Sequence, residues 1–398
     1  MKDSQIRSLI SAERKRQKSV INLIASENYV SKDVLEALGS EFTNKYAEGY
    51  AGKRYYGGNS IVDKVESLCI ERALKLFGLD AASWHVNVQP LSGSPANMAV
   101  YVALVPKEGK IMGMSLDHGG HLTHGHKVSA SGKFWIQVPY GLNKETELLD
   151  YAALKALAVQ EKPAIIVGGY TAYPRTVDFK KLREVADACG ALLMIDMSHI
   201  AGLVAGKAYP SPFEYADIVT TTVHKTLRGP RSALIFSKND ARELGKKIDK
   251  AVFPGLQGGP HVNQIAAVAV ALKEAATPAF KKYAAHVKKN AGTLAAELAV
   301  RGWKIVSGGT DSHLVLVDTW MNGAKNSKGA GAVPGKIASD ALEKAGIIVN
   351  KNAIPFDTRP PADPSGIRLG TAAETTRGKK EKDFKKIAEK IDRVLKML

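Results

Sequence analysis

A lysine stands at the point where an apolar segment of the chain ends. Residues 218–223 are apolar or β-branched, which predicts a strand, and the loop after them carries His224, Lys225, Arg228 and Arg231. Burial and nearby positive charge both favour the neutral form of an amine, so Lys225 could attack a carbonyl group. An amine of this kind forms Schiff bases, the usual attachment of pyridoxal phosphate. A surface lysine in a basic loop is the alternative.

Two other charged residues need a partner. Residues 191–195 predict a buried strand, and Asp196 follows it, where a carboxylate is costly unless it meets a cation or a metal ion. A pyridinium nitrogen would meet that need, whereas capping of the next helix or pairing with a nearby base would also explain Asp196. Arg368 lies between apolar residues in a glycine-flanked strand, so it suits either a bound carboxylate or an internal salt bridge.

The segment Ser92-Gly93-Ser94 precedes an apolar helical stretch at residues 98–104. We expect Ser94 to be the N-cap of this helix and Pro95 its first residue. Free backbone N–H groups, hydroxyls and the positive end of the helix dipole would together make a phosphate site, although a plain capped helix is the alternative. A second glycine-rich loop, residues 252–260, could also let its backbone approach an anion.

Residues 43–58 form an unusual segment with four tyrosines and four glycines but neither helical nor strand periodicity. This composition suits a loop that wraps a ligand or a partner subunit, or else an ordinary surface loop. Glu48 is the only acid in the segment and is therefore a candidate proton carrier.

Residues 116–126 contain four histidines. Metal ligation is one explanation, but the acidic and thiolate partners of a closed metal site are lacking. Stacking of an imidazole on an aromatic cofactor is the better explanation, and we expect no metal.

Composition and charge restrict the class of protein. The chain has 398 residues, 45% of them hydrophobic, and no run of about 18 apolar residues that would span a membrane. We expect a cytoplasmic protein, because the N-terminal segment lacks the apolar centre of a secretory signal and Cys69 and Cys189 offer no disulfide framework. The net charge of +17 comes mostly from scattered lysines without interleaved aromatic residues, so we do not expect nucleic acid as the primary partner.

Strands and helices alternate through the middle of the chain, which predicts a mostly parallel sheet covered on both faces. Ligands of such sheets lie at the carboxyl ends of the strands, where Asp196 and Lys225 are expected. The break at Thr277-Pro278 predicts a domain boundary. We therefore expect an N-terminal helical arm (1–20), a large cofactor-binding domain (21–277) and a smaller C-terminal α+β domain (278–398).

Taken together, these segments resemble the serine hydroxymethyltransferase family of fold-type I pyridoxal-phosphate enzymes. The similar segments run in order from about residue 21 to residue 378: LIASENYVS, TNKYAEGYAGKRYYGG, VNVQPLSGSPAN, GGHLTHG, DMSHIAGLVA, TTTVHKTLRGPR, FPGLQGGP, VNKNAIP and SGIRLGT. The resemblance implies an α/β fold with a mostly parallel seven-stranded sheet in the large domain. It also implies reversible transfer of the serine hydroxymethyl group to tetrahydrofolate, giving glycine and 5,10-methylenetetrahydrofolate through an external aldimine. The implied assembly is a cytoplasmic homodimer whose active sites are shared between subunits.

The resemblance also assigns roles to residues. The catalytic residues would be Lys225, Glu48, His121 and Asp196. Pyridoxal phosphate would be bound by Ser92, Gly93, Ser94, His121, Thr171, Asp196, His199, Lys225, Gly258 and Gly259. The amino acid and folate would be bound by Ser26, Tyr46, Glu48, Tyr56, His199, Arg368, Leu116, Gly120, Leu122 and Asn352. Among these, Glu48, Tyr56, Gly258 and Gly259 would come from the partner subunit.

The chain departs from the family pattern at Leu91, Val223, Ser198, Ala372 and residues 232–233. None of these departures removes a functional group that the chemistry needs, so they bear on packing beneath the cofactor and on rate. A folate-independent aldolase acting on threonine-like amino acids is one alternative, against which the VNKNAIP segment argues. An RNA-binding protein with a residual cofactor site is the other, and salt-dependent RNA retention without serine turnover would favour it.

Overall fold

The computed structural model describes residues 1–398, and a central seven-stranded sheet organises most of the chain. The strands lie in the order β4 (Trp84–Asn87), β10 (Ala233–Lys238), β9 (Ile218–Thr222), β8 (Leu192–Asp196), β7 (Ile165–Gly168), β5 (Lys110–Met114) and β6 (Ile136–Tyr140). Only β10 runs antiparallel to its neighbours. The mostly parallel sheet expected from the sequence is therefore confirmed, and its strands β7 and β9 are buried along their whole length.

Helices cover both faces of this sheet, as the alternation of its side chains requires. On β7, Ile166 belongs to a large core, while Ile165 and Val167 face a smaller one. The large core is closed by α3 (Ser60–Phe77), α6 (Tyr151–Glu161), α7 (Phe179–Cys189) and α10 (Val262–Ala275). The smaller core is closed by α4 (Gly93–Leu104) and α9 (Leu244–Lys250).

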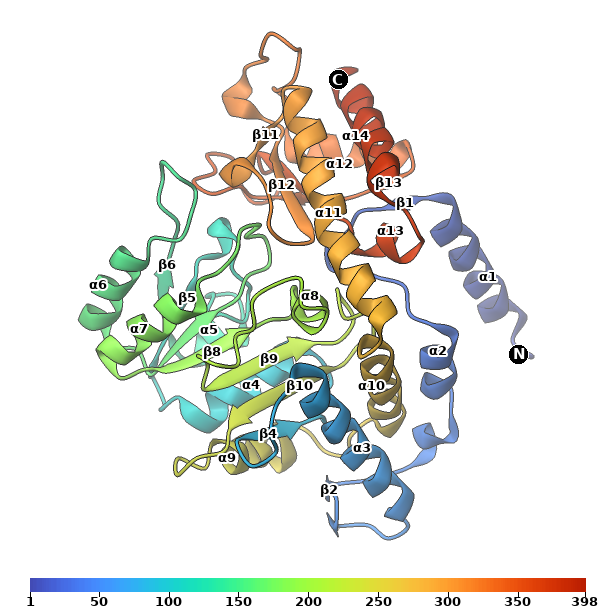
Figure 1. Ribbon diagram of the computed structural model, residues 1–398, viewed down its shortest axis with the longest axis vertical. Coiled ribbons are helices and arrows are strands. Elements are labelled where there is room, and N and C mark those ends of the chain that lie inside the picture. The colour runs from blue at the N-terminus through green and yellow to red at the C-terminus, as the bar shows by residue number, and fades with distance from the viewer.

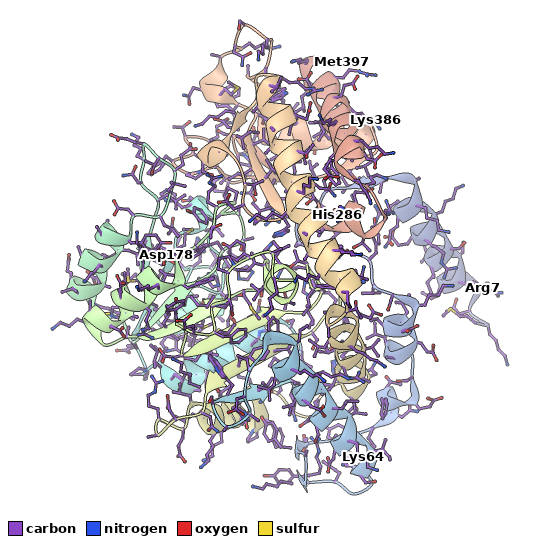
Figure 2. The ribbon with its side chains drawn as sticks, in the orientation of Figure 1. Arg7, Lys64, Asp178, His286, Lys386 and Met397 are labelled. Carbon is purple, nitrogen blue, oxygen red and sulfur yellow. The ribbon has the colours of Figure 1, made fainter.

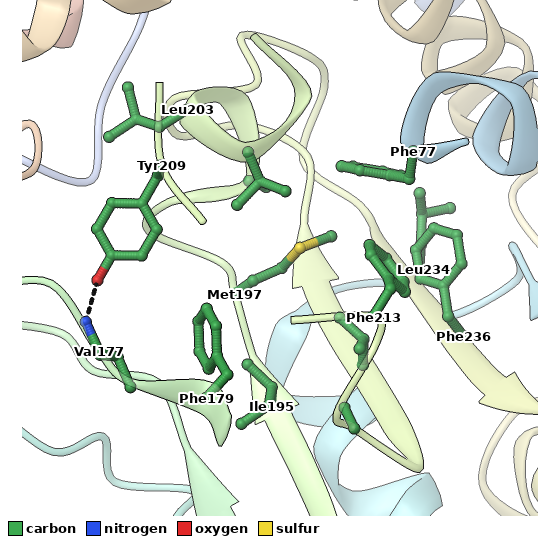
Figure 3. Packing of buried hydrophobic residues seen from close by; sticks show 14 of the residues in the cluster. Phe77, Val177, Phe179, Ile195, Met197, Leu203, Tyr209, Phe213, Leu234 and Phe236 are labelled. Carbon is green, nitrogen blue, oxygen red and sulfur yellow. Dashed lines mark hydrogen bonds between the residues drawn. The ribbon is translucent and has the colours of Figure 1, made fainter. Parts of the chain in front are cut away.

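Figure 3 shows how aromatic side chains fill the large core. Phe77 of α3 and Phe213 pack edge-on or tilted against Phe236 of β10 and against each other, with ring centroids 5.1 to 5.5 Å apart. The Tyr209 hydroxyl, at the edge of the same core, accepts a hydrogen bond of 2.9 Å from the backbone N–H of Val177. Packing in this core therefore fixes α3 and the segments that follow β7 and β8 against the sheet.

The C-terminal part of the chain forms a second, smaller unit. Its antiparallel sheet has the order β11 (Lys304–Ile305), β12 (Leu314–Asp318), β15 (Gly366–Gly370) and β14 (Asn350–Asn352). The helices of this unit are α12 (Gly335–Lys344), α13 (Ala372–Thr376) and α14 (Glu381–Lys396), and α14 buries its apolar stripe in the unit's core. This is the smaller α+β unit expected from the sequence.

Two segments join the units. The long helix α11 (Pro278–Val300) begins immediately after the expected break, yet it packs in both cores, with Phe280 and Val287 in the large one and Leu294 in the small one. Figure 1 shows α11 running from beside α10 into the C-terminal unit. Near the N-terminus, β1 (Ile21–Asn22) pairs in parallel with β13 (Ile347–Ile348), and Leu23 lies in the small core. The exact domain division stays a prediction, since α11 packs in both cores and the segment around β1 packs in the smaller one.

The surface is basic but its charge is dispersed. Figure 2 shows Arg7, Lys64 and Lys386 at the periphery, and they belong to α1 (Ser4–Ser19), α3 and α14 respectively. Helix α1 buries none of its residues. No helix is both long enough and apolar enough to cross a bilayer.

Candidate active site

A cavity of about 220 Å³ lies at the carboxyl ends of the parallel strands, where the sequence places its reactive residues. Fifteen residues line it: Ser92, Gly93, Ser94, Asn97, His121, His124, Tyr170, Thr171, Asp196, Ser198, His199, Thr222, His224, Lys225 and Arg231. Most of them come from the segments that follow β4, β5, β7, β8 and β9. The lining is almost entirely polar, which suits a charged ligand rather than an apolar one.

Lys225 follows β9 and projects into this cavity. Its Nζ donates a hydrogen bond of 2.8 Å to the Thr222 hydroxyl, and its backbone carbonyl accepts one of 2.9 Å from Asn28. Burial lowers the pKa of Lys225 to about 8, with help from the charges of Arg368 and Arg231 and against the opposing effect of Asp196. A substantial fraction of the amine is therefore neutral near pH 8, as a carbonyl nucleophile requires.

Asp196 ends β8, the strand next to β9, and also lines the cavity. Its Oδ2 accepts hydrogen bonds from Asn97 Nδ2 at 2.9 Å and from His124 Nε2 at 3.2 Å, and its Oδ1 accepts one from the backbone of Ser198. Burial opposes ionisation, but the contacts with His124 and Asn97 and the charge of Lys225 hold the pKa of Asp196 well below its usual range. The carboxylate is thus ionised without an arginine or lysine in contact, and it remains available to a cationic ligand atom.

Two of these Asp196 partners were not assigned from the sequence. Asn97 is held by Thr220, whose hydroxyl donates to Asn97 Oδ1 at 2.8 Å, so that the amide N–H₂ faces Asp196. His124 belongs to the histidine-rich segment and is almost completely buried. Its position three residues after His121 was the only signal in the sequence.

His121 lines the cavity as a neutral ring. Its Nδ1 accepts hydrogen bonds from the backbone N–H and the hydroxyl of Thr123, at 3.2 and 2.7 Å. Burial and the neighbouring His124 lower the pKa of His121 to about 4. The ring therefore carries no charge at neutral pH, and its stacking on a cofactor stays a prediction.

The expected phosphate segment lies at the N-terminus of α4, but the helix begins earlier than predicted. Ser92 is the N-cap and Gly93 the first helical residue, so the prediction that Ser94 caps the helix was wrong. Pro95 is accommodated in the first turn, where its missing N–H has no partner to lose. A Cβ on Gly93 would lie 2.6 Å from the Thr222 methyl group, which explains the glycine and shows how closely the helix end approaches β9.

Arg368, on β15 of the C-terminal unit, lies next to the cavity and contacts Thr171, one of its lining residues. Its Nε donates to Asn350 Oδ1 at 3.0 Å, and its Nη1 donates to the Thr171 carbonyl at 2.7 Å. Burial alone lowers the pKa of Arg368 to about 10, because no acidic side chain pairs with it. The internal salt bridge that the sequence left open is absent, and the guanidinium remains available to a bound carboxylate.

Several expected residues lie outside this cavity. Tyr46, Glu48 and Tyr56 flank the short hairpin of β2 (Gly49–Tyr50) and β3 (Lys53–Arg54), close to Gly258 and Gly259. The Tyr46 hydroxyl donates to Glu48 Oε1 at 3.3 Å, and the Tyr46 and Tyr56 rings lie 5.1 Å apart. Both tyrosines are half exposed, at 54% and 50%. The chain gathers these five residues in one place but not at its own cavity.

Five other residues expected to bind substrate do not line the cavity: Ser26, Leu116, Gly120, Leu122 and Asn352. Gly120 lies just after a short helix that begins at Leu116, and the carbonyl of the neighbouring Gly119 accepts a hydrogen bond of 2.8 Å from the backbone of Thr171. Leu122 is exposed, and Asn352 lies on β14 two residues beyond Asn350. Ser26 is half buried beside Ala25, whose carbonyl contacts His313.

This set of donors and charges fits pyridoxal phosphate. An amine with a lowered pKa, an ionised carboxylate that pairs with His124 but with no arginine or lysine, and a helix N-terminus with two serines match the aldehyde, the ring nitrogen and the phosphate of that cofactor. No group of three or more histidine, cysteine, aspartate or glutamate side chains is arranged to hold a metal ion. The fold and the site together define a pyridoxal-phosphate-dependent enzyme of fold type I.

Comparison with known proteins identifies the family. The family model described as serine hydroxymethyltransferase matches residues 1–391. The serine hydroxymethyltransferase of Desulfotalea psychrophila is 55% identical over 393 residues, which are 99% of this chain and 88% of the relative. Those of Koribacter versatilis and Acidobacterium capsulatum are 55% and 54% identical, each over 97% of this chain and 87% of the relative. The chain belongs to the serine hydroxymethyltransferase family.

Proposed function

We propose that this chain binds pyridoxal phosphate at Lys225 and transfers the hydroxymethyl group of serine reversibly to tetrahydrofolate, giving glycine and 5,10-methylenetetrahydrofolate. The observation that carries the proposal is the presence of Lys225 and Asp196 in one polar cavity, with Arg368 hydrogen-bonded to the carbonyl of Thr171, which lines the same cavity. The first two residues suit the cofactor and the third suits the carboxylate of an amino acid. The two free cysteines support the cytoplasm as the compartment.

Each residue has a task that follows from its contacts. When bound, pyridoxal phosphate supplies a ring that takes up the electron pair released from the amino acid. Asp196 would keep the proton on the ring nitrogen, because its carboxylate is ionised and points into the cavity. Ser92, Gly93 and Ser94 would bind the phosphate with hydroxyls and backbone N–H groups.

Arg368 would fix the substrate. A guanidinium binds a carboxylate through two parallel hydrogen bonds, which restricts rotation of the amino acid about its Cα. Asn350 and the Thr171 carbonyl hold the guanidinium in place from the other side. Ser26 would bind the same carboxylate, and Leu116, Gly120, Leu122 and Asn352 would line the folate site.

We further propose a homodimer in which each cavity is completed by the partner subunit. Glu48, Tyr56, Gly258 and Gly259 cluster on the surface of the chain, away from its own cavity, and Glu48 is the only acid in its segment. A carboxylate and tyrosines in that position can serve a second copy of the chain through an isologous contact. Glu48 would then move the proton of the serine hydroxyl.

Two assays test the function. Serine cleavage by the purified protein should depend on added tetrahydrofolate, whereas cleavage at the same rate without it would identify a folate-independent aldolase. Replacement of Lys225 with alanine should abolish turnover and the visible absorbance of the bound cofactor. An undiminished absorbance band in Lys225→Ala would refute the assignment of this lysine.

A further inference from the structure

A buried pair of histidines joins the two units of the chain beside the cavity. His199 follows β8 in the large unit, and His313 precedes β12 in the small one. His199 Nδ1 lies 3.2 Å from His313 Nε2, and the rings are stacked with their centroids 5.3 Å apart. His313 is completely buried and His199 is 7% exposed. No motif in the sequence singles out His313.

The surroundings of His313 decide where its proton lies. Its Nε2 is 3.1 Å from the backbone carbonyl of Ala25, which can only accept a hydrogen bond, so Nε2 carries the proton. Its Nδ1 is buried without a partner. Burial, together with the charge of Arg368, lowers the pKa of His313 to about 3, so the ring is neutral with this single proton.

The proton of His313 in turn decides the state of His199. Burial and the charges of Lys225 and Arg368 hold the pKa of His199 well below its usual range, so this ring is also neutral. Its Nδ1 faces the N–H of His313 and must therefore be the nitrogen without a proton. The remaining proton therefore lies on Nε2. This nitrogen has no hydrogen-bond partner in the protein, and His199 lines the cavity.

We propose that His313 is a positioning residue that fixes His199 in the tautomer whose Nε2–H donates a hydrogen bond into the cavity, to an anionic oxygen of the cofactor or of the amino acid. This inference rests on the proposed function for the identity of the ligand. The state of His199 itself follows from the chain alone. The Nε2–H of His313 faces both the Ala25 carbonyl and His199 Nδ1. His313 therefore also links the segment that carries Ser26 to His199.

Two amide substitutions at residue 313 distinguish the effect of losing the hydrogen bond from the effect of losing the imidazole ring. His313→Gln keeps an N–H near the position of Nε2, whereas His313→Asn has an amide too short to reach either partner. In the ¹⁵N-histidine-labelled apo-protein, the His199 signals, assigned by their absence in His199→Gln, should show a protonated Nε2 in the wild type and in His313→Gln. In His313→Asn the proton should be distributed over both nitrogens.

Binding measurements identify the ligand oxygen. The dissociation constants of pyridoxal phosphate for the apo-protein and of glycine for the holoenzyme should stay within about threefold in His313→Gln. In His313→Asn one of them should rise about tenfold or more, since a hydrogen bond to a charged group is lost. A rise for pyridoxal phosphate places the oxygen on the cofactor, and a rise for glycine places it on the amino acid.

Thr310→Val is the matched control. The Thr310 hydroxyl donates to the carbonyls of Leu314 and Pro174 at the same strand end and also joins the two units, but it does not touch the cavity. This variant should lower the thermal midpoint without changing either dissociation constant. A protonated Nδ1 on wild-type His199, or wild-type values of both constants in His313→Asn, would overturn the proposal.

Discussion

Replacement of Arg368 with methionine gives a direct measure of substrate binding. The guanidinium is buried and has no acidic partner, and burial lowers its pKa from 12.5 to about 10. This difference corresponds to roughly 3 kcal/mol of free energy by which the empty site disfavours the charged form. Removal of the charge offsets much of the loss of the two hydrogen bonds to Asn350 and Thr171, each of about 1.5–3 kcal/mol because the donor is charged. The free energy of unfolding of the apo-protein should therefore change by no more than about 3 kcal/mol.

Substrate binding should change far more. Two hydrogen bonds between a guanidinium and a carboxylate contribute about 1.5–3 kcal/mol each, so the dissociation constant of glycine should rise about 100- to 10,000-fold in Arg368→Met. Absorbance titration of the holoenzyme with glycine measures this constant, and urea unfolding of the apo-protein measures stability. Arg368→Lys should recover only part of the affinity, because an ammonium group cannot form the two parallel bonds.

Arg183→Met is the matched control for loss of a partly buried arginine. Arg183 binds Asp217 at 2.7 Å and Asp187 at 2.8 Å, far from the cavity lining. Its loss should lower stability by about 3 kcal/mol and leave the affinity for glycine unchanged. Wild-type affinity in Arg368→Met, or an equal loss of affinity in Arg183→Met, would refute the role of Arg368.

Three further predictions concern the amine, the assembly and the core. Because the neutral amine is the nucleophile and the pKa of Lys225 is about 8, capture of pyridoxal phosphate by the apo-protein should accelerate roughly tenfold per pH unit below that value and level off above it, as stopped-flow absorbance would show; a flat profile would contradict the lowered pKa. Mixing Lys225→Ala with Glu48→Gln should restore about a quarter of the wild-type activity, since half of the random dimers contain one intact site, and no recovery would mean that Glu48 does not act across the dimer. Phe236→Ala should cost about 3–5 kcal/mol in urea unfolding, whereas Phe134→Ala, at a side chain that is 63% exposed, should cost less than about 0.5 kcal/mol; equal costs would contradict the packing in Figure 3.

The sequence predicted the parts of the site that depend on strand order. Lys225 and Asp196 each follow an apolar strand, and parallel strands bring their carboxyl ends to one edge, so these two residues were expected in one cavity. The helical and strand segments were also readable, because their hydrophobic periodicity is set by burial on one or two faces. The start of α4 was misplaced by two residues, since Ser92 and Ser94 are equally good caps in sequence and only packing against Thr222 selects between them.

The residues that support the site could not be predicted in this way. Asn97, Asn350 and His313 act through contacts with residues 18 to 114 positions away, and nothing in their local sequence marks them. Their importance depends on how the C-terminal unit is placed against the large sheet. Glu48 is the opposite case. The sequence predicts it as a functional residue, but the fold of the single chain does not place it in the cavity.

The pairing of β1 with β13 affects how the protein is made. Ile21 leaves the ribosome early, but its partner Ile347 follows only after most of the chain has been translated, roughly 15 to 65 seconds later at about 5–20 residues per second. During that time the hydrophobic Leu23 has no core to enter, because the helices that enclose it are still to be synthesised. A nascent chain of this protein therefore leaves Ile21 and Leu23 without their native partners for nearly the whole of translation.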